Sequence, residues 1–238
     1  MTPESPISRR WTVTLLLSLT AVTGLVDPAS YLRLGRVFVA NMTGNVVFLG
    51  FSLSPHSGLS ALASITALLG FVVGALAGGR LAVQLAGPPR RWLVVAFGLE
   101  ATVLGVVALL TSLGVAAYHG DARYATIAVL AAALGIQNST VRRLSVPDLT
   151  TTVLTLTLTG LAADSFIAGG PGAKPHRRFG SVVTMFAGAA IGAALLQVSV
   201  TPVIAIAAAI VGLVAIGFAR VRPAVGAGHG SLTDHAAL

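Results

Sequence analysis

Eight apolar stretches separated by short basic clusters limit the folds open to this chain. The stretches lie at residues 11–26, 37–54, 59–81, 92–118, 124–141, 149–168, 180–199 and 203–219. A helix needs roughly 20 mostly apolar residues to cross a bilayer. The chain is 55% hydrophobic and 9% charged, with a mean hydropathy of +0.90, which leaves too few charges to cover a soluble domain. We therefore predict an all-α integral membrane protein.

Two of the stretches, 37–54 and 149–168, are rich in Thr, Asn, Ser and Gly. If all eight stretches cross the membrane with the N-terminus inside, the Lys and Arg residues divide into 8 inside and 7 outside. If the two polar stretches return to the side they entered from, 12 lie inside and only Arg33, Arg36 and Arg123 lie outside. The positive-inside rule therefore favours six transmembrane helices plus two broken or re-entrant segments, with both termini in the cytoplasm.

The two halves of the chain share residues at a nearly constant offset. The matches are Gly24 with Gly135 at 111 residues, Thr43 with Thr155 at 112, and Gly74, Gly78 and Pro88 with Gly188, Gly192 and Pro202 at 114. Because three spans is an odd number, two tandem copies insert in opposite senses, which predicts an inverted-topology repeat. We expect the copies at 11–118 and 119–220, with a cytosolic tail at 1–10 and a disordered cytosolic tail at 221–238. Chance recurrence of Gly and Pro in a Gly-rich chain is the alternative.

Two sequence runs carry a family resemblance. The first extends from Gly24 through Asp27 and Pro28 to Gly35 and continues as Phe38-Val-Ala-Asn41-Met-Thr-Gly-Asn45; the second contains Gly135-Ile-Gln137-Asn138, Arg142-Arg143 and Thr151-Thr152-Val-Leu-Thr155. They resemble the hallmarks of the YoaK-like family of bacterial membrane proteins, which is defined by a domain of unknown function, and the match covers residues 11 to 220. The chain departs from the family where Leu156 replaces a common Gly. The resemblance implies a multi-span inner-membrane protein and brings no substrate or reaction.

Polar residues within the first apolar stretches are candidates for a solute or ion pathway. Asp27, followed by a proline, predicts a helix break in which the acid caps the next segment, or an acid at an entrance. Asn41, Thr43 and Asn45 surround Gly44, whose backbone freedom would expose carbonyl or N–H groups. Irregular backbone at membrane depth needs protein or a water-filled cavity around it, which favours a binding role. Hydrogen bonds between helices are the alternative role for Asn and Thr.

The second half offers matching candidates. Gln137 and Asn138 lie where the first copy has Val26 and Asp27, so uncharged amides replace its acid. Further pathway candidates are Thr151, Thr152 and Thr155. Threonines spaced by four residues form a hydroxyl stripe if the segment is helical. The alternative is that each hydroxyl bonds a carbonyl of its own preceding turn.

Glu100 lies eight residues inside the span that opens near Trp92. An ionised carboxylate is costly at that depth, which makes Glu100 a candidate for proton coupling. A protonated side chain bonded to a neighbouring helix is the alternative. Asp164, near the end of the second polar stretch, is expected to be a solvated or paired end residue.

Small residues predict close helix packing at two places. They are Gly70, Gly74 and Gly78 in one span and Gly188 and Gly192 in another. Glycines spaced by four let helix backbones approach closely. These faces would let the equivalent spans of the two copies cross, or would support a homo-oligomer.

Several function classes find no support in the sequence. There is no cysteine, the five histidines make no H-x-x-x-H spacing, and no nucleophile elbow, phosphate-binding loop or dinucleotide fingerprint is present. The basic clusters fit orientation in a bilayer better than nucleic-acid binding. We therefore expect no enzyme, no metal and no cofactor.

These observations favour a secondary transporter or channel for a small polar solute, with a weak preference for an anion because helix N-termini at the midplane attract negative charge. The expected partners are the lipid bilayer and that solute. The alternative is a non-transporting membrane scaffold or partner subunit that uses its glycine faces for assembly.

Overall fold

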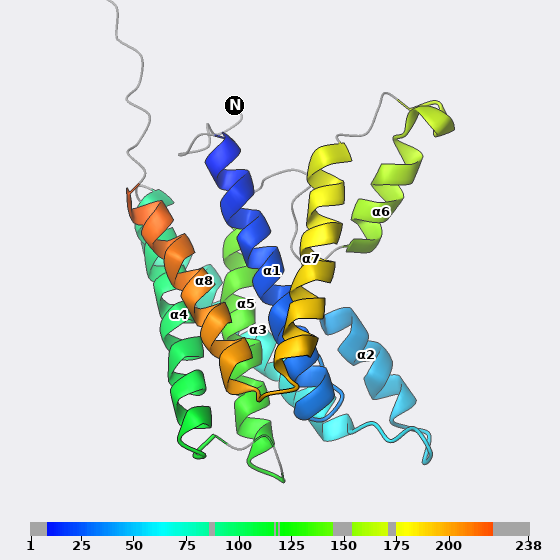
Figure 1. Ribbon diagram of the computed structural model, residues 1–238, viewed down its shortest axis with the longest axis vertical. Helices are drawn as coiled ribbons and strands as arrows, with labels where there is room; N and C mark the ends of the chain where they lie inside the picture. Colours follow the sequence, from blue (N-terminus) through cyan, green and yellow to red (C-terminus); the bar gives the residue numbers. More distant parts are fainter. Residues whose placement is uncertain are drawn as a thin grey trace, which may run out of the picture.

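The computed structural model describes residues 9–85, 89–116, 118, 120–144, 154–170 and 175–220. The predicted tail at 221–238 and residues 1–8 of the predicted tail at 1–10 lie outside them, as do Pro88, Thr151 and Thr152; Arg9 and Arg10 begin α1 instead. Within these ranges the chain is helical and contains no strand (Figure 1). The elements are α1 (Arg9–Arg33), α2 (Met42–Phe51), α3 (Ala61–Gln84), α4 (Pro89–Ser112), α5 (Arg123–Arg143), α6 (Leu154–Ala163), the 3-10 helix η1 (Phe166–Ala168), α7 (Pro175–Leu195) and α8 (Thr201–Arg220).

Helix length separates two kinds of element. Within the described part of the chain, α1, α3, α4, α5, α7 and α8 are long and apolar enough to cross a membrane. By contrast, α2 and α6 have ten residues each, so each is about 15 Å long, half the thickness of the hydrocarbon core. This confirms the predicted all-α membrane fold, with six helices long enough to span a membrane and two short ones.

The two short helices lie in opposite halves of the bundle. In Figure 1, α1 begins at the upper end and α5 begins at the lower end, and successive long helices run in opposite directions. We call the end of the bundle where α1 begins and α8 ends the upper end. The lower end is the one where α1 ends and α5 begins. In the same view α2 lies in the lower half and α6 in the upper half. The opposed placement matches the arrangement that two re-entrant segments entering from opposite sides would produce.

Basic residues gather at the upper end. Because of the helix directions, only Arg33, Arg36 and Arg123 of the described arginines lie at the lower end. The arginines near helix termini at the upper end are Arg80, Arg90, Arg91, Arg142, Arg143, Arg178 and Arg220. The membrane-spanning bundle therefore has a strongly basic end and a weakly basic end.

The long helices pack in a regular pattern around α1 and α5. Helix α3 lies along α5, α7 lies along α1, and α4 lies along α8. In addition α1 contacts α8, and α5 contacts α4. The same set of contacts results when α1, α3 and α4 are exchanged with α5, α7 and α8, respectively.

Glycine allows α3 and α5 to cross closely. Gly70, Gly74 and Gly78 all face α5. A methyl group added at Gly70 would lie 2.6 Å from the backbone oxygen of Ala128, and one added at Gly74 would overlap the backbone oxygen of Ala132. Any side chain at these positions would force the two backbones apart.

The crossing of α7 with α1 uses the same positions of the other half. Gly74 contacts Ala132 as Gly188 contacts Ala21, and Gly78 contacts Ile136 as Gly192 contacts Leu25. Likewise, Gly135 contacts Phe71 as Gly24 contacts Met185. Across every match the α1 and α5 positions differ by 111 residues and the α3 and α7 positions by 114. The glycine faces of α3 and α7 therefore pack on α5 and α1, respectively. Helices α3 and α7, the equivalent spans of the two halves, do not contact each other in the described structure.

The helix break expected at Asp27 and Pro28 is wrong. Helix α1 continues through Pro28 and ends at Arg33. Proline removes one hydrogen bond, to the carbonyl four residues earlier, and membrane helices tolerate that loss where neighbouring helices pack around the site. The carbonyl in question belongs to Gly24, which lies against α7.

Candidate functional site

A non-helical segment, residues 34–41, leads from α1 into α2. Helix α1 ends where the N–H of Arg36 donates to the carbonyl of Tyr31 at 3.1 Å, with Gly35 and Arg36 both at positive φ. Helix α2 then begins after Asn41, whose Oδ1 accepts a 3.5 Å hydrogen bond from the N–H of Gly44. Asn41 is thus the N-cap of the short helix.

Asp27 holds this segment from the side of α1. Its Oδ1 accepts hydrogen bonds from the backbone N–H groups of Val39 at 3.2 Å and Ala40 at 3.0 Å. The side chain is only 5% exposed, so these bonds replace those that water would make. Asp27 therefore caps irregular backbone, as expected for one of its two predicted roles, although it does so from within a continuous helix.

Asn45 holds the same segment from the side of α2. The N–H of Phe38 donates to its Oδ1 at 2.9 Å, and its Nδ2 donates to the carbonyl of Phe38 at 2.6 Å. The ring of Phe38 stacks on Tyr31 and Phe48, and a methyl group at Gly44 would lie 2.7 Å from it. Gly44 therefore leaves room for the ring of Phe38 to pack against α2. It does not adopt an unusual backbone conformation.

The first-half candidates do not all face one way. Successive helical residues turn by about 100°, so Asn41 and Asn45 share a face of α2, and Thr43 points to the other side. Thr43 is exposed and Asn45 is completely buried. The structure thus separates two side chains that bond backbone, the half-buried Asn41 and the buried Asn45, from one accessible hydroxyl.

In the second half, the described part of the threonine run lies on α6. Thr155 is exposed, and the hydroxyl of Thr159 donates to the carbonyl of Thr155 at 2.9 Å. Thr157 is the buried residue of this helix. The local hydroxyl-to-carbonyl bond is the simpler of the two roles expected for these threonines.

Gln137 and Asn138 lie on α5 near its crossing with α1. The Nε2 of Gln137 donates to the hydroxyl of Thr23 at 3.2 Å, while its buried Oε1 has no partner among the described residues. Asn138 donates to the carbonyl of Leu134 at 2.9 Å. The sequence reasoning missed Thr23, although its place one turn before Asp27 on the same helix face was a usable signal.

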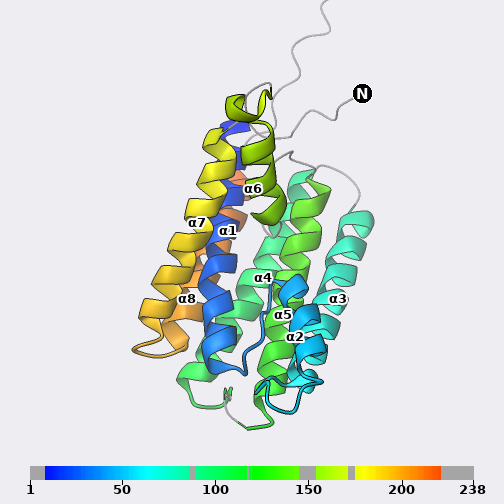
Figure 2. The ribbon, with the colours of Figure 1, turned by 90° about the vertical axis from the view of Figure 1, so that its right-hand side faces the viewer.

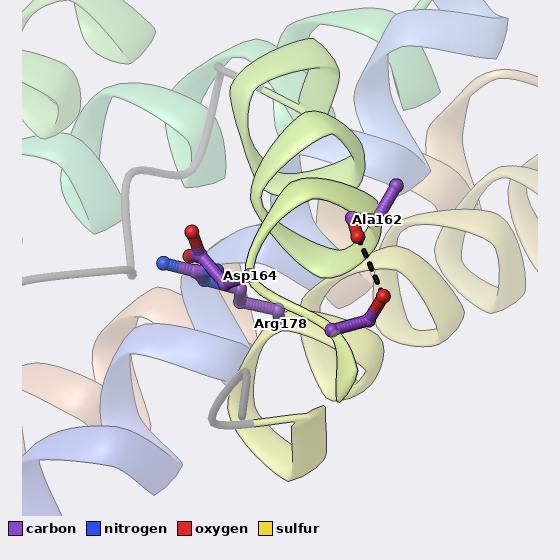
Figure 3. Close-up of polar contacts among 4 residues, drawn as sticks. Ala162, Asp164 and Arg178 are labelled. Carbon is purple, nitrogen blue, oxygen red and sulfur yellow. Dashed lines mark hydrogen bonds and ion pairs between the residues drawn. The ribbon is translucent and has the colours of Figure 1, made fainter. Parts of the chain in front are cut away.

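An ion pair attaches α6 to α7. The carboxylate of Asp164 and the guanidinium of Arg178 point toward each other, as Figure 3 shows, while the hydroxyl of Ser165 donates to the carbonyl of Ala162 at 2.7 Å. Asp164 is therefore a paired end residue, as expected. Gly160 lies against the same guanidinium.

The two short helices approach each other end to end without touching. Among the described helices, α2 contacts only α3, and α6 contacts only α7 and η1. In Figures 1 and 2 the N-terminal end of α6 lies above the N-terminal end of α2 at mid-height. The structure therefore aligns the two candidate groups, but it does not bring Asn45 and Thr155 into contact.

Glu100 lies on α4, apart from the short helices. It is completely buried, and both carboxylate oxygens lack a hydrogen-bond partner among the described residues. Nearby on the same helix, Phe97 stacks on Phe218 of α8 with ring centroids 5.6 Å apart. Helix α4 contacts α3, α5 and α8 but neither α2 nor α6. Glu100 thus forms a separate buried polar position.

Comparison with known proteins gives one family and one relative. Residues 15–217 match the family described as protein of unknown function DUF1275. The chain is 35% identical over 157 residues to the UPF0700 transmembrane protein YoaK of Bacillus subtilis strain 168, an alignment that covers 63% of this chain and 66% of that protein. The chain thus spans slightly less than two thirds of the relative's length. No solved structure matches the chain.

Proposed function

Because the chain belongs to the YoaK-like DUF1275 family, which includes a transmembrane protein, we propose that it is a secondary transporter or channel for a small polar solute in the bacterial inner membrane. The observation that carries this proposal is the pair of half-length helices whose N-terminal ends face each other at mid-height. Helix N-termini leave N–H groups unpaired and carry partial positive charge. A solute with hydrogen-bond acceptors, preferably an anion, fits such a place.

The proposal includes an inverted repeat, with one half rocking against the other. Two observations support it. The helix contacts are unchanged on exchange of the halves, and the glycine contacts match residue by residue at offsets of 111 and 114. Each half also contributes one short helix, and the two short helices lie in opposite halves of the bundle. Alternating access in such folds moves one repeat relative to the other.

In the proposed orientation, the strongly basic upper end faces the cytoplasm. The absence of cysteine allows a direct test with single cysteines at exposed positions: Ser54 and Asp121 at the lower end and Arg142 at the upper end. A membrane-impermeant thiol reagent added to intact cells should label positions 54 and 121 and leave 142 unlabelled. Labelling of 142 alone would reverse the orientation.

Transport itself is tested with purified protein in liposomes, by following volume changes in gradients of potassium acetate, urea and glycerol in turn. Thr155→Ala and Thr43→Ala are suitable variants because both hydroxyls are exposed and neither bonds the segment before α2. We expect at least one solute to permeate faster than in empty liposomes, and Thr155→Ala to change that rate. Asn45→Ala is less informative, because it also removes the bonds to Phe38.

A membrane scaffold or partner subunit is the second candidate function. It is favoured by the use of Asp27 and Asn45 to bind backbone, which gives both residues a structural role. Permeation equal to empty liposomes for all three solutes, together with co-purification of a stoichiometric membrane partner, would support it. Under this alternative, the exposed apolar faces of the bundle would hold the partner or a second copy of the chain.

A further inference from the structure

Two arginines at the lower end of the bundle lie near the turn that ends α1. The guanidinium of Arg123 lies against Gly35, where an added methyl group would be 3.5 Å from its Cζ and 3.6 Å from its Nη1. Arg36 follows Gly35 in the chain and places its own Nη1 3.3 Å from the position of a methyl group at Gly58. One guanidinium thus lies against the turn that ends α1, and the other extends from that turn to the loop before α3.

A hydrogen-bonded group holds Arg123 and extends to the loop that Arg36 contacts. The Nη2 of Arg123 donates to the hydroxyl of Tyr124 at 3.2 Å, and its guanidinium lies 5.1 Å from the centre of that ring. The hydroxyl of Tyr124 is also hydrogen-bonded to Ser60, two residues after Gly58. These contacts fix the guanidinium of Arg123 in place, which lowers the entropic cost of binding a ligand there.

Among the described residues, the carboxylate of Asp121 acts electrostatically on Tyr124, but it forms no ion pair with either arginine. No ion pair joins Arg36 or Arg123 to an acid among the described residues, and the buried Nε of Arg123 has no acceptor there. Arg33 differs, because its Nη2 donates to the carbonyl of Leu196 at 2.7 Å. A buried donor without an acceptor is uncommon in folded proteins and points to a bound water or ion.

The backbone at Arg36 is also unusual. Its φ is +57°, and it is the one non-glycine residue with positive φ in the described ranges. Side chains other than Gly, Asn and Asp rarely occupy this region, and such residues gather at functional sites. An arginine held there directs its guanidinium toward Gly58, two residues before the Ser60 that is hydrogen-bonded to Tyr124.

We infer that Arg36 and Arg123 form a binding site for an oxyanion, of phosphate or carboxylate type, at the lower end of the bundle. Guanidinium groups match the paired oxygens of such anions, and two guanidiniums around one turn without an ion-pair partner attract negative charge. The anion is either free in solution or part of a lipid headgroup, since the site lies at a membrane-facing end. Binding here does not depend on transport.

The test for a free anion uses purified protein in uncharged detergent, with sodium sulfate as the probe and sodium chloride at matched ionic strength as the reference. Thermal unfolding of the wild type should shift upward with sulfate. Arg36→Gln and Arg123→Gln should each weaken the apparent affinity at least about tenfold, because each removes a charge-assisted hydrogen bond. Arg91→Gln is the matched control, an exposed arginine at the upper end whose loss should leave the response unchanged.

The test for a headgroup measures phosphatidylglycerol retained by the same four proteins after purification from mixed vesicles of phosphatidylglycerol and phosphatidylcholine. A selective loss in Arg36→Gln and Arg123→Gln would identify the headgroup as the anion. If either variant fails to fold, Arg36→Lys and Arg123→Lys keep the charge, and we expect reduced but measurable binding. The proposal is overturned if the wild type shows neither sulfate-dependent stabilisation nor selective lipid retention, or if Arg91→Gln loses both to the same extent.

Discussion

The carboxylate of Asp27 accepts a 3.0 Å hydrogen bond from the backbone N–H of Ala40, thirteen residues further along the chain. The bond joins a transmembrane helix to the irregular segment that precedes a half-length helix. Backbone at membrane depth has no water to bond, and each unpaired group there costs several kcal/mol. The short helix can therefore begin inside the bundle only because side chains such as Asp27 satisfy the backbone before it.

Removal of this acceptor should destabilise the protein. In Asp27→Ala, the N–H groups of Val39 and Ala40 lose their partner, at a cost of about 1–3 kcal/mol for each unsatisfied group. Asp27→Asn keeps an oxygen at the same place, and it should unfold close to the wild-type temperature. Thermal unfolding in detergent measures both variants. Equal midpoints for Asp27→Ala and the wild type would show that the two N–H groups find other acceptors.

Asn45 should depend on having both a donor and an acceptor. Asn45→Asp keeps the acceptor for the N–H of Phe38 but places a second oxygen against the carbonyl of Phe38, so it should be at least as destabilising as Asn45→Ala. We expect a loss of about 1–3 kcal/mol for either variant. Thr43→Ala, two residues away and exposed, is the control and should change stability by about 0.5 kcal/mol or less. A fully stable Asn45→Asp would contradict the assigned amide orientation.

Some parts of this architecture follow from sequence and others do not. Apolar length and the distribution of arginines predict six spans and two short segments, because both features are local. The partners of the glycine faces are not predictable in this way: the spacing of Gly70, Gly74 and Gly78 defines a face of α3, but only the three-dimensional packing selects α5 over α7. The two hydrogen bonds between Asn45 and the backbone of Phe38 are likewise not predictable from sequence, because a side chain that bonds backbone leaves no periodic pattern.

Neighbouring glycines on α3 should respond oppositely to the same substitution. A methyl group at Gly74 would overlap the carbonyl oxygen of Ala132, whereas one at Gly79 would meet no atom within 4 Å. Gly79→Ala should therefore be neutral or stabilising by up to about 1 kcal/mol, through higher helix propensity. Gly74→Ala should lower the unfolding temperature, and so should Gly188→Ala at the matching position of α7, which would meet Ala21. Tolerance of alanine at 74 would mean that α3 and α5 separate easily.

Replacement of Glu100 by a neutral side chain of the same shape should not destabilise the protein. Its carboxylate is completely buried with no partner for either oxygen in the described structure, so the ionised form is strongly disfavoured at this depth. Glu100→Gln preserves the shape and cannot ionise, and its unfolding temperature at neutral pH should equal or exceed that of the wild type. Glu100→Ala leaves a cavity between α4 and its neighbours and should be destabilising by about 2 kcal/mol.

The same pair of variants separates structure from proton coupling. If Glu100 exchanges a proton during transport, Glu100→Gln should fold normally yet lose the dependence of solute flux on a pH gradient in liposomes. A scaffold would show no such flux in either protein. A destabilised Glu100→Gln would contradict the absence of partners, because it would require an interaction made only by the carboxylate. Since α2 contacts only α3, and α6 contacts only α7 and η1 among the described helices, any coupling from α4 to the short helices must pass through α3 or α7.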